Sequence, residues 1–206
     1  YLASGGILTN HKSFYYYTDT LLRQKYTVIN NKNFNPATLK GQKLFICDKQ
    51  IRKENYSNDE TFPYSIDAMQ HIGLLAEYTQ KACAHLDNTN GFFIMVEGGK
   101  IDWACHSNDI KTTILEIKAF DLAIQEAYKF YLKHPNETMI IITADHETGG
   151  YSLGRGNNKS GTKEHYGLYM EELEQQTKSH IFNDPKTNNI RQINKKMQVG
   201  WTTAQH

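Results

Sequence analysis

The sequence contains few cysteines and few prolines: three and four among 206 residues. Disulfide cross-links and proline breaks in helices or strands are therefore few at most. Cys47, Cys83 and Cys105 show no Cys-x-x-Cys spacing, and an odd number leaves at least one thiol unpaired. Cys47 falls in a strand-like run and Cys83 in a helix-like one. We therefore expect both to be ordinary core residues.

Charge of one sign and long apolar runs are also lacking. With 23 basic and 22 acidic residues the net charge is +1, so no bulk field favours nucleic acid or an anionic membrane as a partner. No apolar run approaches the roughly 20 residues that span a bilayer. Neither an internal repeat nor a low-complexity linker divides the chain. We expect residues 1–206 to form a single domain, which is long enough to bury a core.

What the sequence does contain is two apolar runs, each of which ends in acidic residues, histidine and glycine. Residues 92–96 lead into Glu97, and residues 138–143 lead into Asp145 and His146. Their branched and aromatic side chains predict buried parallel strands. Open α/β sheets bind ligands at the carboxyl ends of such strands. Two such ends predict carboxylates and imidazoles in one crevice, where a metal-dependent enzyme would hold its metals.

The segment between the two runs is the clearest helix in the sequence. Asn108 or Asp109 can cap its start, and His134-Pro135 ends it because proline cannot continue a helix. Together with the flanking runs it predicts a right-handed βαβ unit. A stripe of large apolar residues is expected to be its buried face, namely Ile114, Ile117, Phe120, Ile124, Tyr128 and Tyr131.

Earlier in the chain we expect two short strands and one more helix. Residues 26–29 and 43–47 are apolar and branched, as short strands are. Pro63 can open a helix that runs to about Leu86, because proline suits the first helical position.

Asp102 and His106 lie four residues apart. If the chain enters a helix after Ile101, both side chains project from one face and can share one ion. A carboxylate oxygen with an imidazole nitrogen suits zinc. In isolation such a pair is more often a helix cap and a surface histidine, but the longer pattern around it favours a ligand pair. Cys105 is not needed as a ligand beside this set.

Two segments resemble the metal-binding motifs of bacterial-type alkaline phosphatases. The first is residues 96–103 (Val-Glu-Gly-Gly-Lys-Ile-Asp-Trp) with His106, and the second is residues 143–150 (Thr-Ala-Asp-His-Glu-Thr-Gly-Gly). Residues 200–206 (Gly-Trp-Thr-Thr-Ala-Gln-His) resemble the segment with that family's last zinc histidine. The resemblance covers nearly the whole chain, but only the C-terminal part of such an enzyme. The N-terminal part, which carries the serine nucleophile, has no counterpart here.

The resemblance implies an α/β fold of three layers, αβα, with a mostly parallel sheet that is incomplete in this chain. It also implies two zinc ions and one magnesium ion with three ligand sets: Asp102, His106 and His206 for the first zinc, Asp145 and His146 for the second, and Glu97 for magnesium. Trp103 would lie near the phosphate. Thr148 stands where the best-known enterobacterial pattern has a histidine beside the ligands, so metal affinity does not carry over.

The activity implied by the resemblance is hydrolysis of small phosphate monoesters through a phosphoserine, by a homodimer in the periplasm or outside the cell. No signal segment is visible in the chain, which begins at Tyr1. Because the nucleophilic serine has no counterpart, we expect this chain alone to have negligible activity. The C-terminal His206 is expected to be poorly held, since chain ends fray.

Two alternatives stay open. Sulfatases, phosphodiesterases and cofactor-independent phosphoglycerate mutases share the two-metal core but use other nucleophiles and other spacing around the ligands. A metal-binding module without catalysis is the alternative from a different class. The two quoted motifs together favour the phosphatase. Activity on monoesters, diesters and sulfate esters would separate the enzymes, and the upstream reading frame would separate an enzyme from a module.

Overall fold

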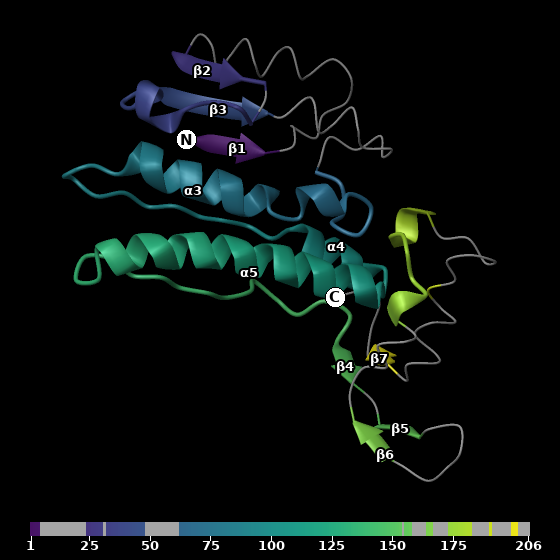
Figure 1. Ribbon diagram of the computed structural model, residues 1–206. Helices are drawn as coiled ribbons and strands as arrows, with labels where there is room; N and C mark the ends of the chain where they lie inside the picture. The colour runs from purple at the N-terminus through teal and green to yellow at the C-terminus, as the bar shows by residue number, and fades with distance from the viewer. Residues whose placement is uncertain are drawn as a thin grey trace. The chain divides into compact units, whose positions relative to one another are not determined.

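The computed structural model describes residues 1–4, 24–30, 32–47, 62–153, 155–157, 164–166, 173–182, 190 and 199–201. The helices are α3 (Leu74–Leu86), α4 (Lys100–His106) and α5 (Ile110–Lys133), with single 3-10 turns η1 (Pro36–Leu39), η2 (Met69–His71) and η3 (His180–Phe182). The strands are β1 (Leu2–Ser4), β2 (Tyr26–Ile29), β3 (Lys43–Cys47), β4 (Tyr151–Leu153), β5 (Arg155–Asn157), β6 (Glu164–Tyr166) and β7 (Val199–Trp201) (Figure 1).

The chain forms two compact units, and each unit is assembled from three separate segments. The first contains Tyr1–Pro63, Gly73–Val96 and Asp121–Ile140. The second contains Tyr64–Ile72, Glu97–Phe120 and Ile141–His206. Helix α5 belongs to both units, because the division falls between its residues 120 and 121.

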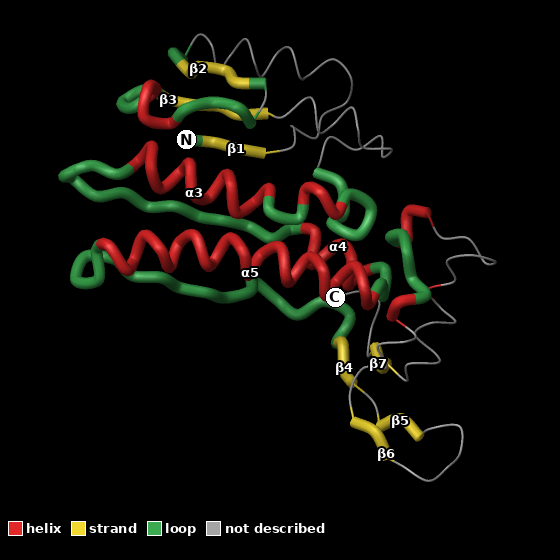
Figure 2. The backbone as a smooth tube through the Cα atoms, in the orientation of Figure 1, coloured by secondary structure: helices red, strands yellow, loops and turns green. Residues whose placement is uncertain are grey.

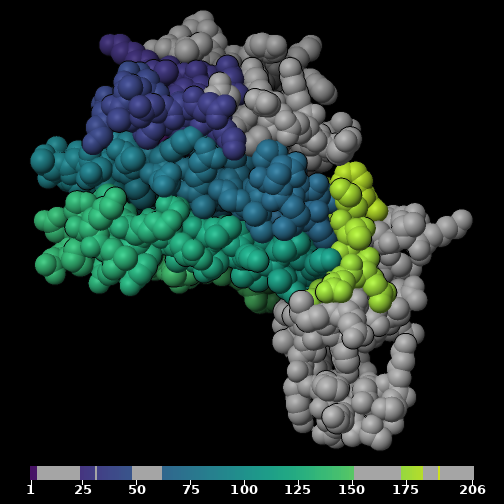
Figure 3. Space-filling model, in the orientation of Figure 1, coloured from purple at the N-terminus to yellow at the C-terminus, as the bar shows by residue number. Residues whose placement is uncertain are grey.

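A parallel sheet forms the core of the first unit. Its strand order is β1-β3-β2, and β3 is paired on both sides. Four consecutive residues of β3, from Leu44 to Cys47, are at most 5% exposed, as expected of a central parallel strand. Leu44 and Ile46 form a cluster with Leu74 and Tyr78 of α3. The atoms of the sheet and of α3 are in direct contact in Figure 3.

Both short strands predicted at 26–29 and 43–47 are confirmed as β2 and β3. The helix predicted from Pro63 begins later, at Leu74. The chain first turns at Tyr64, whose carbonyl accepts hydrogen bonds from the backbone of Asp67 and Ala68, and then forms η2. This segment therefore has turns where the periodicity predicted a continuous helix.

The two runs predicted as buried strands belong to no strand in the described part of the chain, and that prediction is wrong. Figure 2 shows both as loop. Phe93 is 87% exposed, Met95 78%, Met139 82% and Ile141 73%. A strand needs a neighbour for its backbone groups, and no described strand pairs with either run. The predicted βαβ unit is therefore not formed among these residues.

Helix α5 has the predicted ends but not the predicted buried face. It starts after Asp109 and stops at Lys133, two residues before Pro135. In the supposedly buried stripe, Ile117 is 51% and Tyr128 52% exposed. Apart from Ile110, the buried residues of the helix are small or polar: Thr112, Thr113, Glu116, Ala119 and Ala123. Because the runs at 92–96 and 138–143 form no strands among the described residues, they offer this stripe no sheet to pack against.

The strands of the second unit form two small antiparallel sheets, in which β4 pairs with β7 and β5 with β6. Its apolar cluster contains Tyr64, Ile66 and Ala104, with Leu115 packed against them. The cysteines are buried and form no disulfide, as expected for Cys47 and Cys83. Among the helices that the structure describes, none is long and apolar enough to cross a membrane.

Candidate metal centre

Helix α4 carries the first acid–histidine pair, Asp102 and His106, called the α4 pair below. As predicted, the chain enters a helix here, which places the two side chains one turn apart on one face. Asp102 Oδ1 lies 3.4 Å from His106 Nε2, and the two side chains are 35% and 36% exposed. Gly98 permits this tight entry, since a Cβ there would lie 3.1 Å from both Ile101 and Phe120.

Asp145 and His146 form the second pair, called the loop pair below. Asp145 Oδ2 lies 3.5 Å from His146 Nε2, and the aspartate side chain is 90% exposed. The Nδ1–H of His146 donates to the carbonyl of Glu147 at 2.8 Å, and this bond is the main reason that the pKa of His146 is raised. Because a carbonyl only accepts, the bond places a proton on Nδ1, so that in the neutral ring the lone pair is on Nε2.

The loop after this pair folds back on itself. Glu147 Oε2 accepts a hydrogen bond from the backbone N–H of Gly150 at 2.8 Å. Gly149 and Gly150 have φ of 73° and 59°, a left-handed conformation that glycine adopts without strain. The Gly-Gly pair of the motif is thus explained by a turn in the backbone.

The donor atoms of both pairs fit zinc. Oxygen and nitrogen ligands at about 2.0–2.1 Å in a tetrahedron lie about 3.4 Å from each other. The observed separations are 3.4 Å and 3.5 Å. Each pair supplies two donors, and among the described residues no three His, Cys, Asp or Glu side chains form a metal-binding group. His206, the predicted third ligand of the first zinc, lies outside the described residues.

Thr148 connects the two pairs. Its hydroxyl donates a 2.6 Å hydrogen bond to Asp102 Oδ1, across 46 positions of the chain. The same oxygen lies 3.3 Å from His146 Nδ1. Both contacts lie within the second unit, so the structure brings the α4 pair and the loop pair together through one side chain.

The remaining predicted site residues lie apart from these contacts. Glu97 is exposed, and its carboxylate folds over Gly99, where a Cβ would lie 3.2 Å from Oε1. Trp103 is 37% exposed, and Lys100 Nζ lies 4.3 Å from its ring centroid. Cys105 is buried, and burial raises its pKa, which keeps it a thiol and disfavours metal binding.

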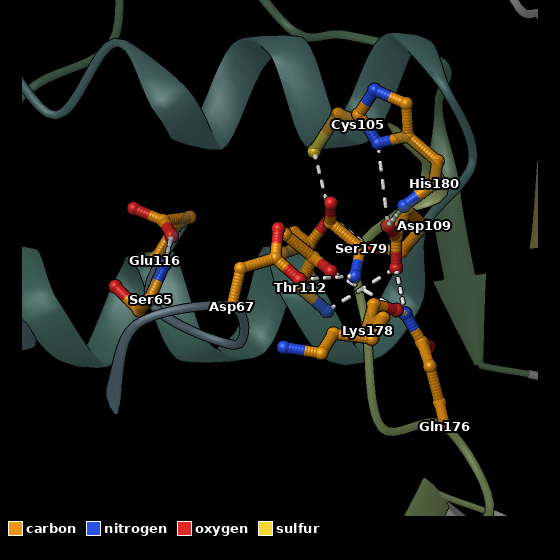
Figure 4. A network of polar contacts seen from close by, with 11 residues as sticks. Ser65, Asp67, Cys105, Asp109, Thr112, Glu116, Gln176, Lys178, Ser179 and His180 are labelled. Atoms are coloured by element: carbon orange, nitrogen blue, oxygen red, sulfur yellow. Dashed lines mark hydrogen bonds and ion pairs between the residues drawn. The ribbon is translucent and has the colours of Figure 1, made fainter. Parts of the chain in front are cut away.

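A buried network around Asp109, at the start of α5, was only partly predictable from the sequence. Asp109, 0% exposed, caps α5 by accepting from the N–H of Thr112 at 3.3 Å. Its carboxylate also accepts from Gln176 Nε2 at 2.5 Å and from the backbone N–H of His180 at 2.7 Å (Figure 4). The cap position predicted the first bond. Nothing in the local pattern indicated partners 67 and 71 residues away.

Two further carboxylates hold backbone groups of the second unit. Glu116 Oε1 accepts from the N–H of Ser65 at 2.6 Å, and burial raises the pKa of Glu116. Asp67 Oδ1 accepts from the N–H of Ser179 at 2.9 Å (Figure 4). Acceptors of this kind, buried at Glu116 and half-buried at Asp67, satisfy backbone donors and join the segments that carry them.

Comparison with known proteins gives a consistent result. A family model described as alkaline phosphatase matches residues 56–206. Alkaline phosphatase 3 of Bacillus subtilis is 42% identical over 97 residues, which are 47% of this chain and 21% of that protein. Alkaline phosphatase 4 of the same organism is 35% identical over 124 residues, 56% of this chain and 27% of that protein. The matched part is thus well under half of either relative.

Solved structures show the same fold. The cold-active alkaline phosphatase of a Shewanella species has a TM-score of 0.73 at 22% identity, covering 99% of this chain and 56% of that one. A variant of the alkaline phosphatase from the Antarctic bacterium TAB5, described with Mg bound in its M3 site, has a TM-score of 0.62 at 27% identity, covering 80% and 46%. These similarities confirm the predicted α/β fold, which is incomplete in this chain.

Proposed function

Because the chain belongs to the alkaline phosphatase family, we propose that it acts in the hydrolysis of small phosphate monoesters, as the metal-binding C-terminal part of such an enzyme. The observation that carries this proposal is the meeting of the α4 pair and the loop pair through Thr148, within the matched segment. The ligand separations of 3.4 Å and 3.5 Å support it.

In this proposal the protein uses two zinc ions and one magnesium ion. Asp102 and His106 hold the first zinc together with His206, and Asp145 and His146 hold the second. Glu97, a hard carboxylate, serves magnesium. When bound, such ions stabilise the charge on the attacking and leaving oxygens of an in-line displacement at phosphorus.

The chain's own residues orient the donors. The helical register of α4 keeps Asp102 and His106 on one face. The carbonyl of Glu147 holds the proton on His146 Nδ1 and so presents Nε2 for binding. Trp103, the residue after Asp102, is 37% exposed, which suits a residue near the phosphate.

We also propose that residues 1–206 form one domain. Each unit is built from three segments that alternate along the chain, so no single cut in the sequence separates them. From the family resemblance the nucleophilic serine belongs to a part with no counterpart in this sequence. The chain alone should therefore have negligible phosphatase activity, and the whole enzyme should be a periplasmic or secreted homodimer.

The test compares three esters at alkaline pH with zinc and magnesium supplied: p-nitrophenyl phosphate, its bis-ester and p-nitrophenyl sulfate. An enzyme that contains this chain in its complete reading frame should prefer the monoester and lose that activity on His106→Ala or Asp145→Ala. The 206-residue chain should show none. Preference for the diester or the sulfate would indicate a sulfatase or phosphodiesterase. Retained zinc without hydrolysis by the complete protein would indicate a metal-binding module.

A further inference from the structure

The hydroxyl of Thr148 lies between groups from both metal-binding motifs. Its 2.6 Å bond to Asp102 Oδ1 joins the loop to helix α4, and its oxygen lies 3.3 Å from His146 Nδ1. Asp102 Oδ1 is also the atom that lies 3.4 Å from His106 Nε2. The Thr148 hydroxyl therefore contacts Asp102 and His146 directly, and its Asp102 acceptor oxygen also lies near His106.

The hydrogen atoms of this cluster can be assigned from the partners. A carboxylate oxygen only accepts, so the single hydroxyl hydrogen of Thr148 points at Asp102. The Thr148 oxygen can then only accept on its other side. His146 Nδ1 carries a proton because it donates to the Glu147 carbonyl at 2.8 Å, and Thr148 is a second acceptor for it at 3.3 Å. In this assignment His146 Nδ1 donates to the Thr148 oxygen, and the Thr148 hydroxyl donates to Asp102.

We propose that Thr148 is a positioning residue that orients Asp102 and His146 together and thereby sets the zinc affinity of this chain. This inference rests on the metal assignment of the proposed function. Its hydroxyl holds the Asp102 carboxylate in the rotamer that turns Oδ1 toward His106. It also supports the His146 tautomer that keeps a lone pair on Nε2.

The surroundings of Thr148 make the hydroxyl well placed for this role. The side chain is partly buried, and its β-branched Cβ has few rotamers. The turn that carries it is closed by the bond from Gly150 to Glu147. Asp102 is about one-third exposed, so without the hydroxyl its carboxylate would compete with water for orientation. Groups that orient metal ligands in this way typically contribute 10–100-fold, by order of magnitude, to metal affinity.

The experiment measures zinc affinity of the 206-residue chain by competition with a chromogenic chelator, and does not depend on turnover. Thr148→Val keeps the shape and removes the hydroxyl, so zinc should bind roughly 10–100-fold more weakly. Thr148→Ser keeps the hydroxyl and should retain most of the affinity. Thr143→Val is the matched control, because its hydroxyl bonds only to the carbonyl of Ala144 among the contacts described. The visible spectrum of Co²⁺ bound to each variant reports the ligand geometry.

Each result decides the matter. Weak binding by the valine variant, with rescue by serine and an altered Co²⁺ spectrum for valine alone, supports the inference. Equal affinity of the valine variant and the parent, with zinc lost on His106→Ala, overturns the inference and leaves the proposed function standing. Equal loss in the valine and serine variants, or a lowered unfolding midpoint for valine, means a packing role and overturns it. A parent chain whose zinc binding is unaffected by His106→Ala overturns the metal assignment and this inference with it.

Discussion

The α4 pair and the loop pair contain the same two residue types, yet they are held in different ways. Asp102 and His106 are fixed relative to each other by one helical turn, and both are about one-third exposed. Asp145 and His146 are neighbours in a loop, and the Asp145 carboxylate is 90% exposed. The donor separations are nonetheless 3.4 Å and 3.5 Å.

This difference shows where support must come from in each case. A helix sets the spacing of i and i+4 side chains by backbone geometry alone. Adjacent residues have no such relation, so the loop pair depends on contacts from Glu147 and Thr148. The α4 pair should accordingly be closer to its zinc-binding geometry before the metal binds. Its geometry should depend mainly on the packing that holds the helix in place.

The largest effect should follow from removing the buried support of α4 and α5. Asp109→Ala removes a helix cap, takes away the acceptor of the His180 backbone N–H and removes one of the hydrogen bonds that Gln176 Nε2 donates. Together these losses should cost about 3 kcal/mol in the free energy of unfolding. Denaturant titration measures this loss. Asp121→Ala on the exposed side of the same helix removes one bond to Gln125 and should cost less than about 0.5 kcal/mol. Similar losses in both variants would contradict the role assigned to Asp109.

The next largest effect should be on zinc affinity, which allows the two pairs to be compared directly. His106→Ala should weaken zinc binding by about 100-fold, since even groups that only orient ligands are worth 10–100-fold. His146→Ala should weaken it by about 10-fold, because the exposed loop pair is less prepared. Chelator competition on the two variants measures both. A larger loss for His146→Ala would reverse the comparison.

A smaller, pH-dependent effect should arise at Glu116. Burial raises its pKa, so between the ordinary value of 4.5 and the raised one the folded chain binds the proton more tightly than the unfolded chain. This favourable contribution is complete at lower pH and is lost as the pH rises through the folded pKa. Glu116→Gln cannot ionise, so its unfolding temperature should rise relative to the parent between pH 4.5 and pH 8 in thermal scans. A constant difference across that range would show that the Glu116 proton is not linked to folding.

The smallest effect on stability should come from the run before the loop pair. Ile141→Lys places a charge on a side chain that is 73% exposed, so the free energy of unfolding should change by less than about 0.5 kcal/mol. Self-association should decrease, because exposed apolar surface promotes it, and sedimentation velocity measures this. Ile46→Lys, at a position 0% exposed, should prevent folding. Large destabilisation by Ile141→Lys would mean that this run is packed in solution.

Local pattern predicted much of the fold, and its largest failure, the two missing strands, has a physical cause. Strands 26–29 and 43–47, the cap at Asp109 and the end of α5 before Pro135 all follow from short-range geometry. The runs at 92–96 and 138–143 have the composition of strands but lack pairing partners among the described residues. Composition indicates that a segment can form a strand, whereas pairing requires another segment beside it.

The same division applies to the site. The sequence by itself determined the residue types and the helical register that aligns Asp102 with His106, because an α-helix repeats every few residues. Only the tertiary structure decided that Thr148 meets Asp102, and that Asp109 meets Gln176 and His180. Those hydrogen bonds join positions 46 to 71 residues apart. Their existence depends on how the whole chain packs, which no local periodicity encodes.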